Sequence, residues 1–160
     1  MTYRTGPVGA LMDEYERAAS ELKAVLAEIP ADTFVKVLDE KTKDEDCRSI
    51  QTIMHHVVSA GYGYSNYIRK HFKTNPAEKR PQLSFANSVE AIGTLDKMLV
   101  YTAETLEPHW DISDQEVMDN IIEVSWGQRY DFEQLLEHAI VHILRHRRQI
   151  ERFLQLSKNQ

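Results

Sequence analysis

Cysteine is nearly absent from this sequence: its 160 residues include only Cys47. A single cysteine cannot form an intramolecular disulfide, which excludes a small secreted scaffold held together by such bonds. A chain of this length can bury enough apolar surface to be stable without them. We therefore expect one domain over residues 1–160 and a reducing, cytoplasmic location.

Long hydrophobic runs and an excess of positive charge are also missing. No stretch approaches the roughly 20 apolar residues of a membrane span, and the first 15 residues lack the apolar segment of a signal peptide. The 19 basic residues are outnumbered by 25 acidic ones, giving a formal net charge of −6. Neither a membrane nor a nucleic acid is therefore expected as a partner. We interpret the local basic group as a solvated helix face: Arg145, Arg147, Arg148 and Arg152.

Proline is scarce, and its five positions all lie outside the segments with helical periodicity. Within each segment, apolar residues recur every three or four positions, as on one face of an amphipathic helix. Ser49 is a good N-cap residue, and the pairs Asn87–Glu90 and Asp131–Gln134 have capping-box spacing. The predicted helices cover residues 8–29, 50–72, 87–106 and 131–156. This pattern predicts an all-α four-helix bundle with one long connection before the last helix.

Two connections are harder to interpret. Residues 31–48 are highly charged, and the segment TFVKVL within them is compatible with a brief extended stretch. In residues 107–130, IIEVSW is expected to be a short strand or an irregular extended segment, and Trp126-Gly127 a turn.

The last predicted helix carries three histidines at four-residue spacing: His138, His142 and His146. At about 100° per residue, His146 falls within the apolar stripe, His142 at its edge and His138 to one side. Two imidazoles one turn apart can bind a single metal ion. The alternative is a structural histidine hydrogen-bonded to a backbone carbonyl.

A third ligand would have to come from another helix. In residues 50–72, His55 lies almost opposite the apolar stripe, whereas His56 lies near its edge, in line with Ala60, Gly63 and Tyr67. Small residues beside His56 leave room for a ligand. His56 is therefore the better candidate.

Three neutral imidazoles with an open fourth position are typical of a catalytic metal site, because a structural site has four protein ligands. Such a site suits Zn²⁺, Ni²⁺, Co²⁺ or Fe²⁺. The sequence contains no Glu-x-x-His, which leaves a ferritin-like di-iron centre unsupported. It also lacks the His-Glu-x-x-His motif of zinc proteases.

The histidine-containing segments resemble those of the DinB/YfiT-like metalloenzymes. HILRHRRQI is similar to that family's His-x-x-x-His-Arg-Gly-Gln ending, SIQTIMHHV to its second-helix motif and WGQRY to its approach segment. Arg148 stands where the family commonly has glycine, and Arg48 where it usually has tryptophan. The resemblance implies that His56, His142 and His146 are the metal ligands. A shifted site that uses His138 remains open.

The resemblance also implies a usually dimeric bundle whose better-understood relatives are thiol-dependent transferases and isomerases. The expected function is that of a metal-dependent enzyme, a thiol S-transferase or hydrolase, acting on a small-molecule substrate. Its cofactors would be Zn, Ni or Fe and possibly a low-molecular-weight thiol. The catalytic residues are unknown, and Tyr67 and Gln149 are either pocket groups or packing and capping residues. The alternatives are a non-catalytic metal- or ligand-binding bundle, and a bundle that binds no metal.

Three apolar residues of the last helix point away from its main stripe: Ile140, Val141 and Leu144. A helix that is apolar on two faces is usually covered on both. We expect a homodimer through this face; coverage by the long connector is the alternative.

Overall fold

The computed structural model describes residues 3–74 and 76–158 and consists mainly of four long helices. They are α1 (Gly6–Ala27), α3 (Ile50–Phe72), α4 (Ser88–Leu106) and α6 (Phe132–Lys158). The structure thus confirms the predicted all-α bundle.

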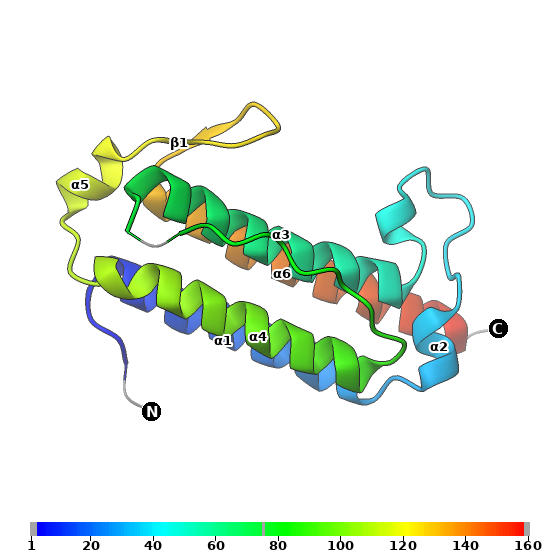
Figure 1. Cartoon of the computed structure of the whole chain (residues 1–160). Coiled ribbons are helices and arrows are strands. Elements are labelled where there is room, and N and C mark those ends of the chain that lie inside the picture. The colour runs from blue at the N-terminus through cyan, green and yellow to red at the C-terminus, as the bar shows by residue number, and fades with distance from the viewer. Residues whose placement is uncertain (1–2, 75, 159–160) are drawn as a thin grey trace.

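The four helices form a closed arrangement in which each packs against two others. Helix α1 contacts α4 and α6, and α3 also contacts α4 and α6. The colour gradient in Figure 1 shows that α1 and α6 run one way and α3 and α4 the other. Because α3 and α4 are parallel, residues 73–87 must return along the bundle before α4 can begin. The long connection expected before the last helix, residues 107–130, does not run along the bundle. It joins the end of α4 to the start of α6 at one end of the bundle (Figure 1).

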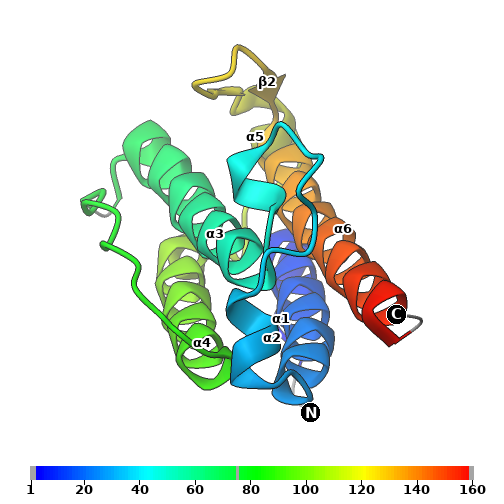
Figure 2. The same ribbon diagram turned by 90° about the vertical axis from the view of Figure 1, so that its right-hand side faces the viewer.

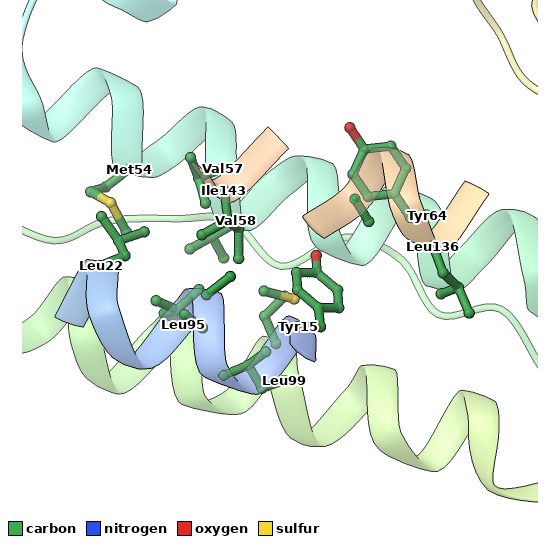
Figure 3. Close-up of a cluster of buried hydrophobic side chains, with 14 of the residues drawn as sticks. Tyr15, Leu22, Met54, Val57, Val58, Tyr64, Leu95, Leu99, Leu136 and Ile143 are labelled. Atoms are coloured by element: carbon green, nitrogen blue, oxygen red, sulfur yellow. The ribbon is translucent and has the colours of Figure 1, made fainter. Parts of the chain in front are cut away.

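The core lies along the centre of the bundle and draws on all four helices. Figure 3 shows part of it, including Leu22 of α1, Met54 of α3, Leu95 of α4 and Ile143 of α6, each at most 1% exposed. Gly61 allows α3 and α4 to approach closely, because a Cβ atom there would lie 2.3 Å from Sδ of Met98. Close packing at this point leaves no space for a larger residue.

The helix starts follow the capping chemistry in the sequence. Ser49 Oγ accepts a hydrogen bond from the backbone N–H of Thr52, and both halves of this capping box are formed. The Asn87 side chain likewise accepts from Glu90 N–H. Asp131 and Gln134 form both hydrogen bonds of the predicted capping box, since the backbone N–H of each donates to a side-chain oxygen of the other. The first helix begins and ends two residues before its predicted bounds, with Pro7 tolerated in its first turn.

The connections contain more structure than the sequence predicted. The expectation of an extended stretch at TFVKVL is wrong for its first half, because α2 (Ala31–Val35) follows directly on Pro30 and fully buries Phe34, whereas Lys36 after the helix is extended. The short helices η1 (Glu45–Cys47), η2 (Glu107–His109) and α5 (Asp114–Asp119) were not predicted. Each is too short to show helical periodicity in the sequence.

The segment IIEVSW does contain a strand. Strand β1 (Ile122–Glu123) pairs antiparallel with β2 (Arg129–Tyr130), with Ile122 opposite Tyr130. The turn between them includes Gly127 at φ +84°, a conformation that glycine adopts without steric cost.

Among the described residues, no helix is both long and apolar enough to cross a membrane. The expectation of a solvated basic face holds for Arg145, Arg148 and Arg152, which are exposed, but not for Arg147. The Arg147 side chain is only 26% exposed and pairs with Glu21 of α1 and Glu151 of α6. It therefore helps to join two helices.

Candidate metal centre

Helices α3 and α6 bring three histidines together. His56 projects from α3 and meets His142 and His146, one turn apart on α6. The ring centroids lie 4.5–5.0 Å from one another. One nitrogen of each ring lies within 4.8 Å of one nitrogen of both others, so this group could hold a metal ion.

The two α6 histidines are buried, which favours their neutral form. His142 is 5% exposed and His146 is 8% exposed. Burial, with added repulsion from His146, His56 and Arg145, lowers the pKa of His142 to about 3. Burial also lowers the pKa of His146, against the opposing effect of its hydrogen bond with Gln149. Neutral imidazole is the form that binds a metal.

Outer partners orient two of the rings. Oδ2 of Asp46 lies 3.3 Å from Nδ1 of His56, and Oε1 of Gln149 lies 3.0 Å from Nδ1 of His146. Carboxylate and amide oxygens accept hydrogen bonds, so both contacts favour the tautomer with the proton on Nδ1 and the lone pair on Nε2. Metal-binding histidines are commonly oriented in this way.

The spacing of the nitrogen atoms also fits a metal ion. Nε2 of His56 and Nε2 of His142 are 2.9 Å apart and share a hydrogen bond. Two nitrogens on a tetrahedral Zn²⁺, at about 2.0–2.1 Å from the ion, are roughly 3.4 Å apart. A metal ion could thus replace the shared proton with a small outward shift of these two rings. The donor set fits the divalent cations that the sequence suggested.

The other candidate histidines occupy different positions. His138 lies one turn before His142, 3.4 Å from the Tyr130 hydroxyl, and is not part of the three-histidine group. His55 packs edge-on against Phe85 with ring centroids 4.2 Å apart. The structure therefore assembles the trio favoured by sequence, and the shifted arrangement with His138 has no counterpart among the described residues.

A pocket of about 460 Å³ opens beside the cluster. His56 and His142 line it, together with the aromatic residues Tyr64, Tyr67 and Trp126. The Tyr67 hydroxyl donates to Ser125 Oγ at 2.6 Å and accepts from Ser125 N–H at 3.0 Å, which ties α3 to the β1–β2 hairpin. A small molecule could therefore reach the histidine nitrogens from this side.

Asp46 is the residue of the site that sequence reasoning missed. It lies in η1, which packs on α3, and in Figure 2 this cyan segment lies over α3 and α6. The connector has no periodicity from which the direction of a side chain could be inferred. The sequence did indicate Gln149 as a neighbour of His146, because a residue three positions later lies on the same helix face.

Cys47 lies near the cluster but is not one of its nitrogen donors. Its Sγ atom is 3.9 Å from Oε1 of Gln149 and donates to Oδ2 of Asp44 at 3.4 Å. Burial raises the pKa of the Cys47 thiol above its ordinary value. The thiol is therefore protonated at neutral pH and is unlike a cysteine activated for nucleophilic attack.

Comparison with known proteins yields one match. The sequence model described as the DinB family matches residues 1–156. No curated protein and no solved structure matches this chain.

Proposed function

Since the chain belongs to the DinB family, we propose that it is a divalent-metal-binding protein whose ligands are His56, His142 and His146. We further propose that the metal serves an enzymatic reaction on a small molecule, of the thiol S-transferase or hydrolase type. The metal would be zinc, nickel or iron. A cytoplasmic location belongs to the same proposal.

One observation carries the metal-binding proposal. The three histidines converge from two helices, and an oxygen atom lies beside Nδ1 of two of them. These oxygens favour the tautomer whose Nε2 lone pair is available to a metal, which is the usual arrangement of metal-binding histidines.

The open side of the cluster supports an enzymatic role. Among the described residues, the group holds three ligands and no fourth, and the neighbouring pocket leads to two of them. When bound, a divalent cation would supply Lewis acidity and would favour the deprotonated form of a thiol or of water. The protein's residues would exclude solvent and position the substrate.

The pocket tyrosines Tyr64 and Tyr67 serve as hydrogen-bonding groups. Burial raises the pKa of Tyr64 to about 12, so its hydroxyl remains protonated. The Tyr67 hydroxyl is engaged with Ser125. Asp46 lies beside Nδ1 of His56 and is proposed as a positioning residue. The general base of the reaction is therefore not assigned to any of these residues.

The test is the metal content of protein purified without a polyhistidine tag, measured by plasma mass spectrometry. We expect near-stoichiometric metal in the parent, its loss in His142→Ala and His146→Ala, and its retention in His138→Ala. His138 is the matched control because it lies on the same helix and outside the group. A parent protein that refuses added Zn²⁺, Ni²⁺ and Fe²⁺ would overturn the proposal. Metal binding without turnover of any thiol or ester would favour the non-catalytic alternative.

A further inference from the structure

The pocket beside the histidine cluster also carries two arginines, Arg80 and Arg145. We propose that they form an anion subsite and that the substrate carries a carboxylate or phosphate group that binds there. This inference rests on the proposed function, because it names the substrate class of the same site. It adds a recognition element that is independent of the metal ligands.

Arg80 is seated on α3 by small residues. It belongs to the long crossover between α3 and α4, and its Nη1 donates to Ser59 Oγ at 3.4 Å. A Cβ atom at Gly63 would lie 2.6 Å from Nη2 of Arg80, so the glycine lets the guanidinium group lie close against α3. Ser59 and Gly63 are four residues apart and therefore share one face of the helix. The exposed Arg80 side chain thus lies along the pocket wall.

Arg145 reaches the same pocket from α6. It directly precedes His146 in the sequence, and its side chain is exposed. Two arginines from separate elements, the crossover and α6, therefore line one pocket.

Neither arginine has a protein counter-ion among the described residues. The ion pairs that the described residues form all involve other basic side chains. The one carboxylate that lines the pocket, Asp46, is directed to Nδ1 of His56. In a chain with a net charge of −6, two unpaired guanidinium groups at one pocket are a local exception. Guanidinium groups match the geometry of carboxylate and phosphate oxygens.

The remaining walls define the rest of the ligand. Tyr64 and Trp126 lie edge to face with ring centroids 6.3 Å apart, and Tyr67 and Trp126 pack in the same way at 5.9 Å. These rings offer an apolar surface beside the polar groups. The preferred substrate is therefore a small organic anion with an apolar or aromatic portion, as most ligand pockets combine both features.

The experiment compares three small probes of similar shape by isothermal titration calorimetry on the metal-loaded protein. Phenylacetate and phenyl phosphate carry the anionic group, and phenylacetamide is the neutral counterpart. We expect both anions to bind at least about tenfold more tightly than the amide, since each charged hydrogen bond contributes a factor of this order. Arg80→Gln and Arg145→Gln should each reduce this preference about tenfold. Lys79→Gln and Arg148→Gln remove exposed charges that do not line the pocket and should preserve it.

The outcomes separate this inference from the proposed function. A preference that persists in both arginine variants but disappears in His142→Ala would show that the anion binds the metal, and would overturn the subsite. Equal affinity for anion and amide in the parent would also overturn it, while leaving the metal centre intact. A preference that depends on both arginines in protein that binds no metal would uphold the subsite and refute the proposed function. Circular dichroism of each variant confirms that the fold is retained.

Discussion

Replacing Asp46 tests whether the contact between the connector and α3 tunes the metal centre. Asp46 lies 3.3 Å from Nδ1 of His56, which favours a proton on Nδ1 and leaves the Nε2 lone pair facing His142. Loss of such an outer partner typically lowers metal affinity by about 10- to 100-fold. The contact is 3.3 Å long and the Asp46 side chain is 61% exposed, so solvent weakens it. We expect the lower end for Asp46→Ala: about tenfold, or about 1.4 kcal/mol.

The assay is competition for Zn²⁺ between the metal-free protein and a chromophoric chelator near neutral pH. Asp46→Asn keeps an oxygen acceptor but loses the charge, so its affinity should fall less than that of Asp46→Ala. Its difference from the parent should shrink at 1 M salt, where the Debye length is only about 3 Å. Glu45→Gln is the matched control, because it removes an equal charge from the adjacent residue, which is paired with Arg48. Parent-like affinity in Asp46→Ala would refute the reasoning.

Three further predictions concern stability and assembly. Gly61→Ala should lower the free energy of unfolding by about 1–3 kcal/mol, because the added Cβ atom would meet the Met98 side chain. Gly93→Ala should raise the free energy of unfolding by about 0.5–1 kcal/mol, because a Cβ atom at Gly93 meets nothing within 4 Å. Urea unfolding measures both effects. Burial lowers the pKa of His109 below its ordinary 6.5, so the unfolded chain binds this proton more readily. Metal-free protein should therefore lose stability as pH falls below about 6.5, and His109→Leu should flatten that loss in urea titrations between pH 5 and 7.5; an unchanged slope would contradict this. Val141 is 49% exposed on α6, on the face where a homodimer is expected. The Val141→Glu variant should therefore be monomeric when it is measured by sedimentation velocity. A monomeric parent protein would refute the dimer.

Much of the bundle was accessible from sequence because its signals are local. Capping residues such as Ser49 and Asp131 satisfy backbone groups within one turn, and the apolar stripes repeat within each helix. The same local geometry placed His142 and His146 on neighbouring turns of one helix. The short elements escaped prediction because α2 and η1 contain too few residues to show a period.

The candidate site likewise contains residues that the sequence indicated and residues that it did not. The angular projection of α3 favoured His56 over His55, and the structure does place His56 against His142 while His55 packs on Phe85. Nothing in the spacing of residues 31–48 indicated that Asp46 would reach His56, nor did the crossover indicate where Arg80 would lie. The positions of these side chains depend on how irregular segments fold against helices.

The sequence by itself therefore determined the four long helices, their bounds to within about two residues, and which histidines share a face. These properties follow from hydrogen bonds and periodicity over a few residues. Only the tertiary structure decided that α3 and α6 lie side by side, and that Asp46 and Arg80 reach the pocket between them. The physical reason is that these contacts join residues distant in the chain, and their geometry is set by packing of the whole bundle.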